Sequence, residues 1–212
     1  FGLEPMGIAG VGIATLIDRI LMMIIMGGYV LKSKYFNEYM LHFNFFSVQI
    51  KRIKAILKIG APVAFQYTFE VGLFAGASLI AGKIGALDQA AHNVALTLAS
   101  MTYMMATGIA SAITIKIGNS YGKENYDRLK TFAKIAYRII LAFMIFTAII
   151  FAVFNHTLAS LMTTDKEVIA LAAQLLIIAG LFQLFDGTQV IGLGILRGIG
   201  DVNIPTIITL FA

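Results

Sequence analysis

The 212-residue sequence has no cysteine, only three prolines and few charged residues. The absence of cysteine excludes disulfides and metal sites built from thiolates. Charged residues make up 13% of the chain and hydrophobic residues 59%, whereas a soluble domain is about one quarter charged. This balance excludes an ordinary water-soluble domain and indicates a protein whose main solvent is a lipid bilayer.

Long apolar runs divide the sequence into predicted membrane spans. A helix needs about 20 apolar residues to cross a hydrocarbon core about 30 Å thick. Five runs reach this length and a sixth begins near the end, so we predict an all-α, polytopic transmembrane helix bundle. Because the chain lacks an initiator Met and stops inside an apolar run, we interpret it as a fragment. The predicted spans are Gly7–Leu31, Ile59–Gly82, Ala90–Ile115, Ile135–Phe154 and Val168–Leu196, with Ile204–Ala212 opening the sixth.

Basic residues lie mainly in alternate connections between the spans. Twelve lie after the first and third spans, whereas the intervening connections hold only Lys83 and Lys166. This alternation is the positive-inside pattern, so the connections 32–58 and 116–134 are predicted to be cytoplasmic. It explains the formal charge of +5 without a nucleic-acid partner. The twelve are Lys32, Lys34, Lys51, Arg52, Lys54, Lys58, Lys116, Lys123, Arg128, Lys130, Lys134 and Arg138.

The connection 32–58 also shows helical periodicity. Its apolar residues recur at steps of three and four, with basic residues between them. This pattern is typical of an amphipathic helix in the plane of the headgroups, and it would mark a boundary between two halves of a protein. A helix packed on the ends of the bundle is the alternative. The recurring residues are Phe36, Met40, Phe43, Phe46, Ile50, Ile53 and Leu57.

Prolines and glycines predict where spans begin and where helices meet. Pro5, Pro62 and Pro205 each fall near the start of a predicted span, where a missing N–H matters least. Gly72 and Gly76 form a G-x-x-x-G arrangement inside the second span. Such a pair is predicted to let two helix backbones approach closely.

Two carboxylates fall in the middle of apolar spans. Glu70 is the only charged residue in Ile59–Gly82, and Asp186 is the only one in Val168–Leu196. Insertion scales put an acidic residue at this depth at about 2.5–3.5 kcal/mol unfavourable, so each should face protein or a water-filled cavity. No Lys or Arg lies at comparable depth in these two spans or in the two between them, so we hypothesise that they bind a mobile cation, H⁺ or Na⁺. A carboxyl group hydrogen-bonded to a neighbouring helix is the alternative.

Neutral polar residues accompany both carboxylates. Gln183 and Gln189 lie three residues on either side of Asp186, and Gln66 lies four residues before Glu70. Amide and hydroxyl oxygens suit a hard cation such as Na⁺. These three glutamines and Tyr103 are therefore candidate ion or substrate ligands together with Glu70 and Asp186.

A polar stripe runs along the span between the two carboxylates, and its residues recur at steps of three or four. The stripe either lines a site or forms hydrogen bonds between helices. Met101, Met104 and Met105 lie beside it and could give a cavity an adaptable apolar surface, although packing explains them equally well. The stripe consists of Asn93, Thr97, Ser100, Thr107, Ser111 and Thr114. Further along the chain, Arg197 and Asp201 are predicted to form a local ion pair in a glycine-containing turn.

Two stretches resemble the multidrug and toxic compound extrusion (MATE) family of transporters. The run Lys58-Ile-Gly-Ala-Pro-Val-Ala, with Glu70 eight residues after its proline, and the run from Gly82 to His92 resemble the seventh and early eighth helices. The stretch from Phe185 to Asp201 resembles the tenth helix and the turn after it. The likeness covers essentially the whole chain, from the sixth helix to the start of the eleventh, and points to the NorM-like branch.

The resemblance implies two six-helix lobes joined by a cytoplasmic linker around a cavity that opens alternately to each side. Residues 1–31 would be the last helix of the N-terminal lobe, 32–58 the linker, and 59–212 most of the C-terminal lobe. Glu70 and Asp186 match the acidic positions that handle Na⁺ or H⁺, and Tyr103 lies near a cation-site position. The implied activity is cation-coupled export of small organic, often cationic, compounds from the inner membrane. No cofactor beyond the coupling ion is expected, and the remaining lobe and membrane lipid would be its partners.

Three other functions stay open at this point. A lipid-linked oligosaccharide flippase shares the general architecture, but it should carry cationic residues in its cavity to meet phosphate. An intramembrane enzyme could use the two carboxylates, but the sequence has no Gly-x-Gly-Asp or His-Glu-x-x-His motif. We therefore do not expect an enzyme. A passive channel or structural subunit is the third alternative.

Overall fold

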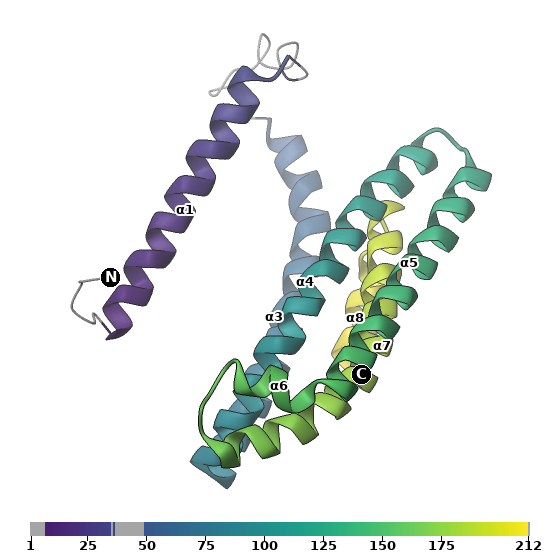
Figure 1. Ribbon diagram of the computed structural model, residues 1–212. Helices are drawn as coiled ribbons and strands as arrows, with labels where there is room; N and C mark the ends of the chain where they lie inside the picture. Colours follow the sequence, from purple (N-terminus) through teal and green to yellow (C-terminus); the bar gives the residue numbers. More distant parts are fainter. Residues whose placement is uncertain (1–6, 35, 37–48, 212) are drawn as a thin grey trace. The chain divides into compact units, whose positions relative to one another are not determined.

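The computed structural model describes residues 7–34, 36 and 49–211. The chain forms two compact units, Phe1–Arg52 and Ile53–Ala212, and each is described by itself. Figure 1 shows the helices of both units.

The first unit contains one long helix, α1 (Gly7–Lys32). Its side chains are largely exposed, and they are apolar around most of the helix, as at Val11, Leu16 and Met23. A helix that is apolar on every side is typical of a membrane span. The first predicted span is therefore a helix with the expected bounds.

The second unit is built around three long helices that lie side by side. Figure 1 shows α4, α5 and α7 along one another, with the short α6 at one end of them. The turn between α4 and α5 has only three residues, which makes these two helices antiparallel neighbours. The helices of this unit are α3 (Ile50–Ile84), α4 (Ala86–Gly122), α5 (Tyr126–Val153), α6 (Asn155–Ser160), α7 (Lys166–Gly198) and α8 (Asn203–Phe211).

Five of these helices, α1, α3, α4, α5 and α7, are long and apolar enough to cross a membrane. They coincide with the five complete spans expected from the sequence, and the all-α fold class is confirmed. Helix α3 has 35 residues and α4 has 37, whereas about 20 cross the hydrocarbon core. Both helices therefore extend beyond the apolar layer.

Helix α3 begins earlier than the sequence pattern predicted. It starts at Ile50 rather than near Pro62, and it continues through this proline without a break. Proline removes one backbone hydrogen bond, but the periodicity on both sides of Pro62 is helical and the helix is maintained. The last residues of the predicted linker are thus continuous with the span. Residues 37–48 of that linker lie outside the described residues, and the boundaries between lobes stay a prediction.

The core of the second unit lies between α4, α5 and α7. The buried residues of α4 recur at steps of three and four, so one face of the helix packs inward. Many of them are alanines, and small side chains let membrane helices approach closely. One cluster comprises Ala106, Ala110, Ile113, Ile117, Ala136, Ile140, Met144, Val190 and Ile191, and a second comprises Ala91, Ala95, Leu98, Phe151, Ala159, Val168, Ala172 and Leu176.

Glycines of α7, and not those of α3, mark the closest helix contacts. A Cβ atom at Gly194 would lie 2.9 Å from the carbonyl oxygen of Ala110, and one at Gly187 would lie 2.7 Å from Met144. Among the described residues, nothing lies within 4 Å of a Cβ at Gly72 or Gly76. The predicted role of the G-x-x-x-G pair in close packing is therefore wrong within this unit, because α3 meets its neighbours through longer side chains.

Side chains cap the N-termini of two helices by accepting hydrogen bonds from free backbone N–H groups. Asn125 Oδ1 accepts a hydrogen bond from the Arg128 backbone N–H at 3.1 Å and caps α5. Asp165 Oδ1 accepts from the N–H groups of Glu167 and Val168 and caps α7. Such caps typically contribute about 1 kcal/mol each. The six-residue α6 between α5 and α7 was not predicted, because it is too short to show a periodic pattern.

Gly194→Ala should lower the melting temperature of the full-length protein in detergent by several degrees. The new methyl group would overlap the Ala110 carbonyl and force α4 away from α7, and overpacking of this kind costs about 1–3 kcal/mol. Gly72→Ala is the matched control, because it adds the same methyl group where the described residues leave open space. Alanine is the better helix former, so the control should melt at or slightly above the wild-type temperature. Equal melting of the two variants would contradict the close α4–α7 contact.

Candidate functional site

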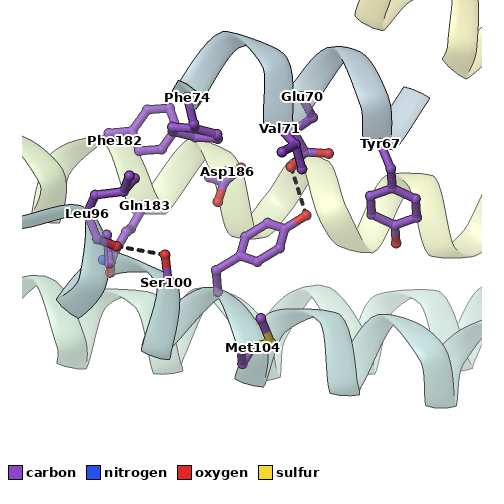
Figure 2. A pocket seen from close by; sticks show the side chains of 12 residues that line it. Tyr67, Glu70, Val71, Phe74, Leu96, Ser100, Met104, Phe182, Gln183 and Asp186 are labelled. Atoms are coloured by element: carbon purple, nitrogen blue, oxygen red, sulfur yellow. Dashed lines mark hydrogen bonds between the residues drawn. The ribbon is translucent and has the colours of Figure 1, made fainter. Parts of the chain in front are cut away.

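A cavity of about 260 Å³ lies between α3, α4 and α7. Helix α3 contributes four residues to its wall, α4 five and α7 three, and Figure 2 shows their side chains from close by. Most of the wall is apolar, so a charged group placed there is partly removed from water. The lining residues are Tyr67, Glu70, Val71, Phe74, Leu96, Ala99, Ser100, Tyr103, Met104, Phe182, Gln183 and Asp186.

Glu70 reaches the cavity from α3 and is held by a phenol from α4. The Tyr103 hydroxyl donates a hydrogen bond of 2.7 Å to Glu70 Oε1, and both side chains are half-buried. Figure 2 draws this bond as a dashed line at Glu70. A short bond to an ionised acceptor is among the stronger hydrogen bonds in proteins. The phenol therefore fixes the position of one carboxylate oxygen and leaves the other available.

Asp186 enters the same cavity from α7, three residues after Gln183. Both side chains project from α7 into the space between the helices in Figure 2. Within the described part of the chain, no hydrogen-bond donor reaches the Asp186 carboxylate. Gln183 is 2% exposed, and its Oε1 accepts from the Thr147 hydroxyl at 3.4 Å. Its Nε2 is buried without a partner among the described residues, so it can donate to a bound molecule.

The structure thus brings together four of the six candidate ligands: Glu70, Tyr103, Gln183 and Asp186. Gln189 does not reach the cavity and is exposed. Three residues advance a helix by 300°, so Gln183 and Gln189 lie on clearly different sides of Asp186. Only one of the two glutamines can share the cavity with the carboxylate.

Gln66 is also outside the cavity and belongs to a buried polar network next to it. It is 1% exposed, accepts a 2.9 Å hydrogen bond from Arg197 Nη2 and donates to the Thr209 hydroxyl at 3.2 Å. Arg197 Nη1 donates to the Tyr67 hydroxyl at 3.0 Å, and its guanidinium lies 4.9 Å from the centre of the Tyr67 ring. This network joins α3, α7 and α8.

The predicted ion pair between Arg197 and Asp201 is replaced by this network. Arg197 belongs to α7 and is directed toward α3 rather than toward the turn that follows. Its long side chain reaches a residue 131 positions earlier in the chain, which local sequence spacing cannot reveal. Tyr67 lies between this cation and the cavity, and neither Lys nor Arg lines the cavity itself.

Most of the predicted polar stripe on α4 is satisfied within its own helix. Thr97, Ser100, Thr107 and Ser111 each donate to a backbone carbonyl of the preceding turn. Of the stripe, only Ser100 lines the cavity. The remaining two bond to neighbouring helices: Ser78 donates to Asn93 at 3.0 Å, and Thr114 donates to the Gly194 carbonyl at 2.8 Å. Of the three methionines beside the stripe, only Met104 lines the cavity.

Three of the four aromatic residues of the cavity wall, Tyr67, Phe74 and Phe182, were not predicted. Phe74 of α3 and Phe182 of α7 meet edge to face with ring centroids 6.3 Å apart, and Tyr67 adds a third ring. Nothing in a run of apolar residues distinguishes a ring that lines a cavity from one that faces lipid. The sequence analysis singled out Asp186 on α7, and Phe182, which lies one turn before it, lines the same cavity.

The site presents oxygen atoms of the kind that hard cations prefer. Two carboxylates, a phenol and an amide face a mostly apolar space. The described residues contain no group of three or more His, Cys, Asp or Glu that could hold a metal ion. A weakly held cation that enters and leaves fits this set of ligands.

The long apolar helices around this site define a multi-pass membrane protein. The MatE family model matches residues 62–212, which is most of the chain, and the chain belongs to this family. The resemblance to MATE transporters is thereby confirmed.

Curated relatives carry the name NorM. The chain is 35% identical to "Probable multidrug resistance protein NorM" of Mesorhizobium japonicum over 97% of its own length and 45% of the relative's. It is 35% identical to the protein of that name in Shewanella oneidensis over 100% and 46% of the two lengths. It is 34% identical to "Multidrug resistance protein NorM" of Aliivibrio fischeri over 95% of its own length and 44% of the relative's. The chain thus spans about half the length of the curated relatives it matches.

Arg197→Met should lower the melting temperature of the full-length protein in detergent by several degrees. It leaves the buried Gln66 carbonyl oxygen without its donor, and an unsatisfied buried acceptor costs about 1–3 kcal/mol. Arg138→Met removes the same charge from an exposed position of α5 and serves as the control. Similar melting temperatures for the two variants would show that the Arg197 network does not join α7 to α3.

Proposed function

We propose that this chain is part of a cation-coupled antiporter that exports organic, often cationic, compounds across the inner membrane. The observation that carries the proposal is that Glu70 and Asp186, from two different helices, line one cavity that contains no Lys or Arg. Carboxylates without a fixed counter-charge in apolar surroundings favour a cation as their partner. Both Na⁺ and H⁺ suit oxygen ligands, so either can be the coupling ion.

Because Glu70 belongs to α3 and Asp186 to α7, binding of an ion between them would change how strongly the two helices are held together. A cation between α3 and α7 offsets the charge of both carboxylates, and its departure restores their repulsion. A conformation that keeps the two helices close is therefore stabilised by the ion, and one that separates them is favoured by its loss. Alternating access follows when the two conformations open to opposite sides of the membrane.

The way the helices are joined supports α3 as the element that moves. Helices α4, α5 and α7 pack closely through small residues, whereas α3 is joined to α4 and α7 by side-chain hydrogen bonds. A few hydrogen bonds between membrane helices are each worth only about 0.6–2 kcal/mol. A shift of α3 therefore breaks fewer contacts than a shift of α7 against α4.

The cavity wall suits the cationic part of an organic substrate. The rings of Tyr67, Phe74 and Phe182 offer faces to a positive charge, and Met104 adds a flexible apolar surface. A space of about 260 Å³ is slightly below the usual range for a drug-sized ligand, about 300–1,000 Å³. We infer that this chain binds the cationic group of the substrate, which competes with the coupling ion for Glu70 and Asp186.

The names of the relatives support export of several drugs, because each is called a multidrug resistance protein. By the positive-inside pattern, the connections 32–58 and 116–134 face the cytoplasm. The other lobe of the transporter and the surrounding lipid are the proposed partners. An oligosaccharide flippase is less well supported, because a cavity lined by carboxylates and by no Lys or Arg would repel a lipid phosphate.

Glu70→Gln and Asp186→Asn should each lower the rate of ion-driven efflux roughly tenfold or more, because a lost charged partner is worth about 1.5–3 kcal/mol. The measurement is efflux of a fluorescent organic cation from proteoliposomes that contain the full-length protein, under an imposed Na⁺ or pH gradient. The gradient that accelerates wild-type efflux identifies the coupling ion.

Glu167→Gln is the matched control, because Glu167 is an exposed carboxylate at the start of the same helix as Asp186. It should couple efflux to the gradient as the wild type does. Normal coupling by both cavity variants would overturn the proposed role of the carboxylates. Efflux by the wild type that ignores every ion gradient would overturn the antiporter itself.

A further inference from the structure

A second cavity, of about 270 Å³, lies where α4 ends and α5 begins. It is lined by three cationic side chains and by no carboxylate, although Glu124 lies in the turn between the two helices and Asp127 in the first turn of α5. The positive-inside pattern explains why cations gather in this connection, but it does not require that they line one cavity. The lining residues are Lys116, Asn119, Ser120, Lys123, Asn125, Arg128 and Phe132.

The two helices place the cations on one wall by simple helical spacing. Lys116 and Ser120 lie four residues apart on one face near the end of α4, and Lys123 follows directly as the C-cap of this helix. Arg128 lies in the first turn of α5, directly after the cap that Asn125 provides. The start of a helix also carries partial positive charge. The three cations and the start of α5 favour an anion, and the lysines offset the partial negative charge that the end of α4 carries.

Aromatic residues place this cavity at the level of the lipid headgroups. Tyr121 and Tyr126 flank the turn between α4 and α5, their rings lie edge to face with centroids 6.4 Å apart, and both are about half exposed. Tyrosines with this exposure gather where the hydrocarbon layer meets water. Phe132, which is partly buried, adds an apolar patch to a wall that is otherwise polar.

We propose that this cavity binds the phosphate group of an anionic membrane lipid. Lys and Arg are common ligands of phosphate, and the neighbouring Asn side-chain amides can donate further hydrogen bonds. Basic pockets between membrane helices on the cytoplasmic side are suited to anionic headgroups. The lipid, with its phosphate between the end of α4 and the start of α5, would stabilise the antiparallel pair. The proposal requires membrane insertion of these helices and does not depend on the transport cycle.

The test is a titration of the full-length protein with dioctanoyl phosphatidylglycerol in an uncharged detergent. Binding is measured by isothermal titration calorimetry. Lys123→Gln/Arg128→Gln should weaken binding about tenfold or more, because each basic residue near a headgroup contributes appreciably to anionic-lipid affinity. Lys130→Gln/Lys134→Gln removes the same charge from exposed positions of α5 outside the cavity, and it should stay within about twofold of the wild type.

Two further titrations identify the source of the phosphate. Dioctanoyl phosphatidylcholine, which carries the same phosphate without net charge, should bind more weakly than the glycerol lipid. Inorganic phosphate should also bind more weakly, because it lacks the chains and glycerol that meet Phe132. Inorganic phosphate that binds as tightly as the lipid would overturn the lipid as ligand. Equal losses in the two double variants, or no binding by the wild type, would overturn the site.

Discussion

The close contact between α4 and α7 is the constraint on which the second unit depends. Gly194 brings the two backbones together at Ala110, and the Thr114 hydroxyl donates to the Gly194 carbonyl across the contact at 2.8 Å. In a membrane, where lipid is as apolar as the helices, association depends on such close packing and on polar contacts. This contact fixes the side of the cavity that carries Tyr103, Gln183 and Asp186, and α5 covers the same pair of helices through Ile140 and Met144.

The other side of the cavity has a different physical character. Helix α3 brings Glu70 to the site. It accepts hydrogen bonds from Tyr103 and Arg197, donates one from Ser78 to Asn93, and is bonded to α8 through Thr206 and Thr209. Each of these bonds depends on direction as well as distance, so together they specify a register for α3 without a large packed surface. The candidate site therefore combines one wall held by packing with one wall held by polar contacts.

Sequence patterns predicted the elements well and the contacts between them poorly. Five apolar runs of the right length are enough to identify five helices, because crossing a bilayer leaves few alternatives to a helix. The isolation of Glu70 and Asp186 within apolar runs was likewise enough to predict that both face a cavity or protein, because a charge exposed to lipid is costly. Both line the same cavity. The reach of Arg197 to Gln66, the exposure of Gln189 and the open space beside Gly72 depend on how helices are rotated about their axes. Rotation is decided by side chains that are far apart in the sequence, and a single apolar helix shows little preference for one face.

The glycine next to Asp186 has a consequence for how the carboxylate can respond to an ion. Gly187 lies directly against Met144 and Ile140 of α5, with no room for even a methyl group. A rotation of α7 about its own axis would drive other side chains into this contact, so the orientation of Asp186 is coupled to the whole of α5. The backbone that carries Asp186 is therefore held in one orientation by α5, and the carboxylate can change position only by rotation about its own side-chain torsions.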